Sequence, residues 1–286
     1  MQNLQSNIKY YSAKKSDDLK LNNNIKSIAI GSFDGLHLAH QKLIDQVDGI
    51  VVIERNSGYL TPGYRRSLFT TKTCCIYHLD KVKLLNAETF VKRLQDDFPA
   101  LEKIVVGYDF AFGKEKMGNA KDLKALFNGE VHIVDEVEHN GISVHSRVIK
   151  SYLKDGNIKM ANELLGRYYQ IEGEVVKGQG LGKKELVATL NLNVKNYQLP
   201  LAGVYATRTK VGSTWLASVS FFGHRVTTDN SYAVETHVIE QDIGTIDGTI
   251  ELEFVEHIRP NKKFNNLTEL KQQIFDDIIE AKKILI

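Results

Sequence analysis

The sequence of 286 residues contains little cysteine, little proline and no long apolar run. Its two cysteines, Cys74 and Cys75, are adjacent, which is a poor basis for a disulfide framework. No apolar run approaches the roughly 18 residues that cross a membrane as a helix. The N-terminal stretch 1–18 is polar and has no apolar segment typical of a signal peptide. We therefore expect a cytoplasmic protein without a membrane partner.

The sequence also has no large excess of charge of one sign. It contains 37 Lys and Arg residues and 35 Asp and Glu residues, for a net charge of +2. This balance gives no general attraction to nucleic acid, so we expect no nucleic-acid partner. The 42% of apolar residues is enough for ordinary cores. At roughly 100–200 residues per domain, the length predicts two domains. Only four prolines are present, so no proline-rich linker separates them.

The first half of the chain alternates between apolar strand patterns and helical patterns. The predicted strands are 27–30, 49–54, 74–79, 103–107 and 130–136, and the predicted helices are 40–47, 87–98, 120–127, 146–154 and 157–166. Continuous apolar strands separated by helices indicate a parallel sheet that is covered on both faces. The first half therefore predicts a doubly wound α/β domain.

The second half changes character at Tyr169, where short strands with alternating side chains begin. Glycine-containing turns separate these strands at the spacing of a small antiparallel β-barrel. An amphipathic pattern over 267–285 predicts one C-terminal helix. The change of pattern places the predicted domains at 1–166 and 167–286.

Two histidines follow the first predicted strand in the stretch "IAIGSFDGLHLAHQKLI", residues 28–44. His37 and His40 share one face of a helix start, where backbone N–H groups attract phosphate. Ligands of open α/β sheets bind at the carboxyl ends of strands, which favours a phosphate site. The residues alone also allow a metal pair or an incidental pair. A zinc site would need further ligands, and the sequence offers none nearby.

The stretch "GSFDGLHLAHQKLI" resembles the signature G-x-F-D-G-x-H-x-G-H-Q, which is typical of the bacterial bifunctional riboflavin kinase/FMN adenylyltransferase family, the FAD synthetases. The resemblance implies that His37 and His40 are catalytic in adenylyl transfer. It implies that ATP or flavin contacts the residues at the start of the motif, namely Gly31, Phe33, Asp34 and Gly35. The chain departs from the pattern at Ala39, where the family has glycine.

A second block, "VVGYDFAFGKEKMGN" at 105–119, resembles the family pattern V-V-G-x-D-F-x-F-G-x-x-R-x-G. The resemblance implies ATP or flavin binding by Asp109, Phe110, Phe112 and Lys116, with lysine where the family has arginine. A lysine holds phosphate as a point charge without the bidentate fork of arginine. From the residues alone, a place of the two phenylalanines in the core is the less favoured alternative.

Two further family blocks are altered. The family's I-S-S-T-x-I-R block aligns with "VHSRVIK" at 144–150, which implies that Ser146 and Lys150 lie near the phosphates. A serine and basic residues at a helix start still form an anion site. The family's T-F-x-P-H-P block is absent. The stretch 51–66 takes its place, and Arg65 and Arg66 are candidates to compensate for it.

The stretch "LLGRYYQIEGEVVKGQGLGKKELVATLNL" at 164–192 resembles the start of the family's riboflavin kinase domain. The family's P-T-A-N signature reads "ATLN" here. The resemblance implies that Gly178, Gly182 and Asn191 contact ATP or flavin, and that Thr189 and Asn191 hold Mg²⁺. Hydroxyl and amide oxygens are ligands that such a hard cation accepts.

The stretch "YAVETHVIE" at 232–240 resembles the family's v-E-x-H-x-l strand, in which the glutamate is the kinase general base. The resemblance implies that Glu235 takes the proton of the ribityl hydroxyl during phosphoryl transfer. Without the resemblance, one glutamate on a strand is a surface residue. The stretch "GHRVTT" at 223–228 resembles the family's G-x-R-P-T block, with Val226 in place of proline.

Together these blocks occur in the family's order between residues 26 and 279. They imply a nucleotidylyltransferase domain followed by a riboflavin kinase barrel. The implied reactions are phosphorylation of riboflavin to FMN by ATP, and adenylylation of FMN to FAD with release of pyrophosphate. Two alternatives stay open: a relative that retains one activity, and a non-catalytic flavin-binding regulator.

Overall fold

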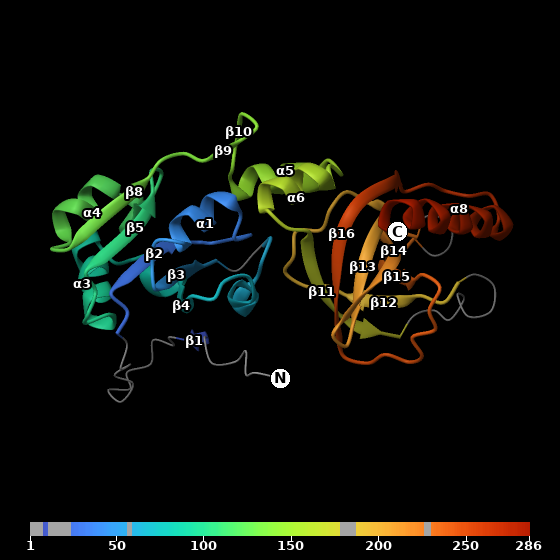
Figure 1. The fold of residues 1–286 in the computed structure, drawn as a ribbon, viewed down its shortest axis with the longest axis horizontal. Helices are drawn as coiled ribbons and strands as arrows, with labels where there is room; N and C mark the ends of the chain where they lie inside the picture. Colours follow the sequence, from blue (N-terminus) through green and yellow to red (C-terminus); the bar gives the residue numbers. More distant parts are fainter. Residues whose placement is uncertain (1–7, 11–23, 56–58, 178–186, 226–229) are drawn as a thin grey trace. The chain divides into compact units, whose positions relative to one another are not determined.

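The computed structural model describes residues 8–10, 24–55, 59–177, 187–225 and 230–286 (Figure 1). Its contacts divide the chain into two compact units. The first comprises Met1–Ser57 and Thr61–His145, and the second comprises Gly58–Leu60 and Ser146–Ile286.

The first unit is built on a six-stranded parallel sheet. In order across the sheet the strands are β1 (Ile8–Tyr10), β4 (Thr73–His78), β3 (Gly49–Glu54), β2 (Ser27–Gly31), β5 (Lys103–Gly107) and β8 (Glu130–Val134). The five predicted strands of this half are confirmed. The short strand β1 was not predicted, and it adds to the edge of the sheet beside β4.

Helices cover both faces of this sheet, as the continuous apolar strands predict. One core cluster includes residues of α1 (Leu38–Ile44), and the other includes residues of α3 (Ala87–Asp97) and α4 (Ala120–Leu126). Adjacent Cys74 and Cys75 lie in opposite clusters, because successive side chains of a strand face opposite ways. Both cysteines are buried, and neither is in a disulfide.

Short elements complete the first unit. They are α2 (Leu79–Val82), the 3₁₀ helices η2 (Gly63–Phe69) and η3 (Lys114–Lys116), and the strand pairs β6 (Ala111–Phe112) with β7 (Gly118–Asn119) and β9 (Glu138–His139) with β10 (Ile142–Ser143). Strand β2 lies between β3 and β5, so the direction of the strand order reverses beside it. The loops after β2 and β5 therefore leave the same edge of the sheet side by side, where α/β folds bind ligands.

The second unit is a closed antiparallel barrel, as predicted. Its six strands, in order around the barrel, are β11 (Tyr169–Val176), β12 (Leu190–Asn193), β15 (Tyr232–Val238), β14 (Thr214–His224), β13 (Gly203–Val211) and β16 (Thr249–Pro260). The predicted C-terminal helix is α8 (Leu267–Leu285), which packs against β13, β14 and β16 (Figure 1). No helix in the described ranges is long and apolar enough to cross a membrane.

Two helices precede the barrel and pack with it. They are α5 (Ser146–Lys154) and α6 (Ile158–Leu165), and α6 contacts β11 and β16. The side chain of Asn162 joins them further, since it donates to the carbonyl of Phe254 and accepts from the N–H of Tyr169. The continuous part of the second compact unit therefore starts at Ser146, whereas the sequence places a domain boundary at 166. Which segment folds independently stays a prediction.

The barrel interior has an aromatic half and a hydroxyl half. The aromatic half consists of Tyr169, Tyr205, Phe222 and Phe254, whose ring centroids lie 4.9–5.7 Å apart along the contacting pairs. All four rings are buried. Rings at such distances and angles fill a core and attract one another by their edges and faces.

The hydroxyl half is a closed circle of five buried side chains, at most 1% exposed: Thr207, Ser218, Thr209, Thr236 and Ser220. Each contacts the next at 2.7–3.0 Å, and Ser220 returns to Thr207. Thr209 donates to Ser218, and Ser220 donates to Thr236. These two bonds run in the same direction around the circle. The other three must then run the same way, so each hydroxyl donates once and accepts once. The polar atoms thus satisfy one another without water.

We expect Thr209→Val to destabilise the barrel by about 1–3 kcal/mol, because it leaves the hydroxyl of Thr236 without its acceptor in a buried place. Urea unfolding of the full chain measures the change. Thr214→Val is the matched control, since Thr214 is exposed on β14 and we expect a change within about 0.5 kcal/mol. Equal stability of both variants would show that the circle contributes nothing.

Candidate functional sites

The loop after β2 carries the first group of predicted site residues. Gly31 ends β2, and the chain then turns sharply with positive φ angles at Phe33 (46°), Gly35 (94°) and Leu36 (42°). Phe33 and Leu36 are buried beside α1 in the core of the sheet. Non-glycine residues hold such a backbone only where the surroundings fix it. Burial of these two side chains therefore anchors the turn that precedes the histidines.

His37 caps α1 with its own imidazole. Its Nδ1 accepts from the backbone N–H of His40 at 3.4 Å, as an N-cap oxygen does in other helices. Because Nδ1 is the acceptor, the proton of the neutral ring lies on Nε2. The ring of His40 stacks on it, with centroids 3.6 Å apart and planes at 16°. The structure thus brings both predicted histidines together at the start of α1.

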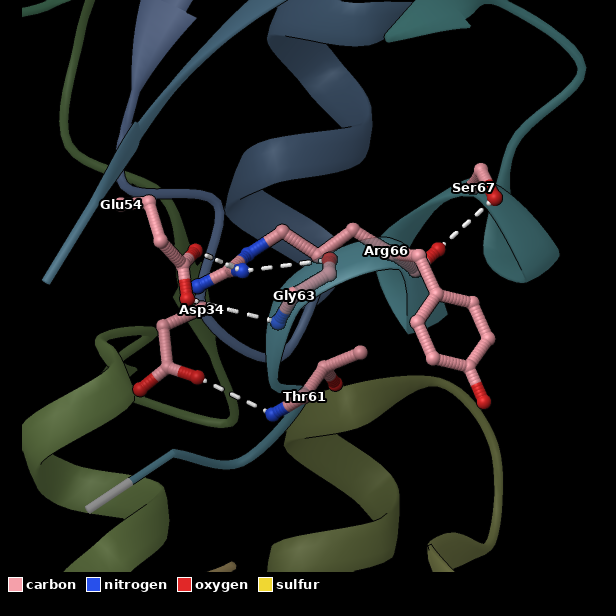
Figure 2. A network of polar contacts seen from close by, with 7 residues as sticks. Asp34, Glu54, Thr61, Gly63, Arg66 and Ser67 are labelled. Atoms are coloured by element: carbon pink, nitrogen blue, oxygen red, sulfur yellow. Dashed lines mark hydrogen bonds and ion pairs between the residues drawn. The ribbon is translucent and has the colours of Figure 1, made fainter. Parts of the chain in front are cut away.

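Neighbouring side chains hold the same loop in place. Gln41 donates its side-chain amide to the carbonyl of Leu36 at 3.1 Å. Asp34 is 6% exposed and accepts from the backbone N–H of Thr61 at 3.0 Å (Figure 2). The ring of Phe33 meets that of His40 edge-on at 5.1 Å. Phe33 therefore supports the ring of His40, and Asp34 ties the loop to the chain that follows β3.

The loop after β5 carries the second group. Asp109 is exposed, and Phe110 is half-buried with its ring stacked on that of Phe112 at 5.4 Å. Phe112 is buried against Phe90 in the core beneath α3 and α4, as the residues alone allowed. Strand β5 pairs with β2, so Asp109 and Phe110 leave the sheet beside the histidine loop. Contact of either ring with a ligand stays a prediction.

Lys116 is exposed on a tight turn of the same loop. Gly113, Glu115 and Lys116 have positive φ angles of 75°, 57° and 58°. The backbone conformation lies in the left-handed region, where side chains are rare. Phosphate binding by Lys116 stays a prediction.

A buried ion pair occupies the carboxyl end of β3, where the family's T-F-x-P-H-P block is absent (Figure 2). Arg66 donates Nη1 to Oε2 of Glu54, and their side chains are 1% and 8% exposed. The backbone N–H of Gly63 donates to Oε1 of the same carboxylate at 3.4 Å. Arg65 is buried as well. Arg66 therefore fixes the η2 turn on the end of β3, a structural role that the sequence did not indicate.

Ser146 and Lys150 belong to the second unit. Ser146 is the first residue of α5, and Lys150 lies one turn later on the same helix; both are half-buried. The predicted helix start at 146 is confirmed. Their contact with phosphate stays a prediction.

Asn191 and Glu235 are direct partners on neighbouring barrel strands. In the register of β12 and β15, Asn191 lies opposite Glu235. Side chains of opposed residues project on the same face. Thr236 belongs to the interior circle, so Glu235 and Asn191 lie on the outer face of the barrel. Thr189 precedes β12 and is half-buried. The structure thus brings the predicted base and a predicted metal-binding residue together.

Arg225 joins these two residues, and the sequence did not predict its part. It directly follows β14, and Nε and Nη2 both donate to Oε1 of Glu235, at 2.8 and 2.5 Å. Nη2 also donates to Oδ1 of Asn191 at 2.7 Å, and Nη1 to Oγ of Ser231 at 2.7 Å. Arg225 matches the arginine of the family's G-x-R-P-T block in the stretch "GHRVTT". This match could have indicated its part in the site.

His237 holds the chain before β12. Its Nδ1 lies 2.8 Å from the carbonyl oxygen of Ala188, which requires that Nδ1 carries a proton and donates. His237 lies two residues after Glu235 and on the same face of β15. The spacing of E-x-H could have indicated this pairing, since it places both side chains beside the "ATLN" stretch.

Two predicted binding residues, Gly178 and Gly182, lie outside the described residues, as does Val226. Within the described ranges, no group of three or more His, Cys, Asp and Glu side chains is arranged to hold a metal ion. The Thr189 and Asn191 pair offers only neutral oxygens. A cation held there would need most of its ligands from phosphates and water, as Mg²⁺ commonly does.

Two family models match separate parts of the chain. The FAD synthetase model matches residues 68–148, and the riboflavin kinase model matches residues 165–285. The first match covers the loop after β5 and the start of α5. The second covers the whole barrel and α8.

Similar proteins cover nearly the whole chain. The bifunctional riboflavin kinase/FMN adenylyltransferase of Buchnera aphidicola subsp. Acyrthosiphon pisum is 27% identical over 93% of this chain and 95% of its own. The protein of that name from Listeria monocytogenes is 27% identical over 88% and 90%. A crystal structure described as a macrolide-efflux protein from Streptococcus pneumoniae has a TM-score of 0.78 and 25% identity, over 90% of this chain and 94% of that one.

We expect Arg66→Met to destabilise the first unit by about 3–5 kcal/mol, because it leaves the buried charge of Glu54 without its partner. The double variant Glu54→Leu/Arg66→Met should recover most of that loss, since neither charge of the pair is then left buried without its partner. Thermal or urea unfolding of the full chain measures both. Lys26→Met removes the exposed pair with Glu102 and serves as the control, with a change below about 1 kcal/mol. A double variant as unstable as Arg66→Met would contradict this account of the pair.

Proposed function

Because the chain belongs to the bifunctional riboflavin kinase/FMN adenylyltransferase family, we propose that each of its two units performs one step of FAD synthesis. The barrel transfers the γ-phosphoryl group of ATP to riboflavin, which gives FMN and ADP. The α/β unit transfers the AMP group of a second ATP to FMN, which gives FAD and pyrophosphate. The observation that carries the proposal is that each unit holds a separate cluster: the His37–His40 pair and the Asn191–Arg225–Glu235 group.

In the proposed adenylyl transfer, a phosphate oxygen of FMN attacks the α-phosphorus of ATP, and pyrophosphate leaves. Negative charge increases on the phosphate oxygens in the transition state. The start of α1 offers backbone N–H groups, and His37 offers the Nε2–H that its capping bond assigns. Stacking fixes the ring of His40 beside it. Within this unit, Lys116 is the proposed further contact of the phosphates.

In the proposed phosphoryl transfer, Glu235 accepts the proton of the ribityl hydroxyl as that oxygen attacks the γ-phosphorus. The hydroxyl of Thr189 and the amide oxygen of Asn191 would hold Mg²⁺. Oδ1 of Asn191 accepts one hydrogen bond from Arg225 and has a second lone pair, so the donor set fits such an ion. When bound, Mg²⁺ would neutralise phosphate charge.

A second candidate function is that of an enzyme retaining only the kinase step. One observation favours it: the buried Glu54–Arg66 pair stands at the end of β3 where the family has T-F-x-P-H-P. Arg66 donates to Glu54, and compensation for the absent block by Arg65 or Arg66 stays a prediction. For either candidate we propose a cytoplasmic enzyme, since two cysteines outside any disulfide fit a reducing compartment.

We expect His37→Asn to reduce FAD formation from FMN and ATP by about 10²–10³-fold, because it removes a donor to the transition state. Asparagine is a good N-cap residue, so this variant keeps the cap of α1. His37→Ala should lose the same activity and, in addition, about 1 kcal/mol of stability. Chromatography of the flavin products measures FMN and FAD separately. FMN formation from riboflavin should be unchanged in both, and FAD formation by either variant at the wild-type rate would overturn the assignment.

We expect Glu235→Gln to reduce riboflavin phosphorylation by about 10²–10⁴-fold, because the amide cannot accept the hydroxyl proton. Riboflavin binding, followed by quenching of flavin fluorescence, should persist. Glu251→Gln is the matched control, since Glu251 is another barrel glutamate, paired with Lys210 at 2.8 Å. It should phosphorylate riboflavin normally. Unreduced turnover in Glu235→Gln would exclude this residue as the base.

A further inference from the structure

We propose that Arg225 is a positioning residue for the phosphorylation of riboflavin: it fixes the carboxylate of Glu235 and the amide of Asn191 relative to each other. This inference rests on the proposed kinase function of the barrel. Arg225 directly follows β14. In this proposal it contacts neither riboflavin nor a phosphate, and it acts through Glu235 and Asn191. Three observations carry it.

The first observation is the unequal use of the two oxygens of Glu235. Both N–H groups that reach this carboxylate, from Nε and Nη2 of Arg225, end on Oε1. Within the described ranges, no hydrogen bond ends on Oε2. Two bonds to one oxygen restrict rotation of the carboxylate about its terminal bond. Oε2 is therefore held as the oxygen that is open to a substrate hydroxyl.

The second observation is that the same guanidinium bonds the cross-strand partner of Glu235. Nη2 donates both to Oε1 of Glu235 and to Oδ1 of Asn191. Register alone places these residues opposite each other on β12 and β15, but it leaves their side chains free to rotate. The planar guanidinium sets the spacing of the two oxygens, which a lysine ammonium on its flexible stem does not do.

The third observation is that Arg225 is itself restrained. Nη1 donates to Oγ of Ser231, and the side chain is 18% exposed. Its backbone N–H donates to the carbonyl of Ser231 at 2.9 Å, so side chain and backbone both bind the start of β15. A charged group with few free rotamers can orient its partners at little further entropic cost. The bonds thus link β12, β14 and β15 at one point on the outer face of the barrel.

The test compares Arg225→Lys and Arg225→Ala with the wild-type chain in steady-state phosphorylation of riboflavin. We expect kcat to fall by about 10²-fold in both variants, as misplacement of a reacting group does. KM for riboflavin should change little, because Arg225 does not contact it. Guanidinium chloride at millimolar concentration should restore part of the kcat of Arg225→Ala and none of the kcat of Arg225→Lys.

Arg208→Met is the matched control, because Arg208 is a partly exposed barrel arginine that contacts the ring of Tyr168 and the carboxylate of Glu253. It should keep wild-type kcat. FAD formation from FMN reports on the integrity of the chain and should be unchanged in all variants. A kcat of Arg225→Ala near that of wild type, or a loss of both activities without rescue, would overturn the proposal.

The double variant Arg225→Ala/Glu235→Gln separates this proposal from the function on which it rests. If Arg225 acts through Glu235, the double variant should be no slower than Glu235→Gln alone. Multiplicative losses would instead mean that Arg225 acts on its own, for example on phosphate, and would contradict the positioning role. Normal turnover in Glu235→Gln alone would refute the proposed base, whatever Arg225 does.

Discussion

The alternation of side chains along paired strands is the constraint on which both units depend. In the first unit both faces of the sheet are buried, so every residue of β3 from Gly49 to Val52 lies in a core. In the barrel the inner face of each strand packs in the interior, and the outer face of β15 carries the candidate kinase site. On β15, Thr236 points inward to the circle of hydroxyls, whereas Glu235 and His237 point outward to the candidate kinase site. A slip of one residue in the pairing of β15 would exchange these roles, so the interior circle also protects the register of the outer site.

The two candidate sites share one feature. In each, a hydrogen bond to one atom of a proposed catalytic side chain orients the rest of that side chain for the reaction. Nδ1 of His37 accepts from the backbone at the start of α1, which places the proton of the neutral ring on Nε2. Glu235 gives Oε1 to Arg225, which leaves Oε2 as an acceptor. In each case a hydrogen bond holds one atom, Nδ1 of His37 or Oε1 of Glu235, and this bond fixes the direction of the other, Nε2 or Oε2. Preorganisation of this kind lowers the cost of orienting groups when the substrate binds.

Much of this arrangement was predictable from the sequence because it depends on local pattern. The apolar runs that became β2, β3, β4 and β5 read as strands, and the histidines followed the first of them. Strand β1 was missed, because three residues in a polar stretch become a strand only by pairing with β4. Arg225 was missed as a site residue, because only the register of β14 and β15 brings it to Glu235. Burial of Glu54 with Arg66 was not predictable either, since it depends on a turn that folds back on the sheet end.

The circle of five hydroxyls has an electrostatic consequence for the barrel. Its O–H groups follow one another head to tail in a single sense, so their dipoles point around a ring and largely cancel. The same groups in parallel would create a field across an interior where little solvent screens it. The closed arrangement lets the barrel bury five polar groups whose net dipole near Glu235 is small. The hydroxyl dipoles behind the strand that carries Glu235 therefore largely cancel instead of adding to its charge.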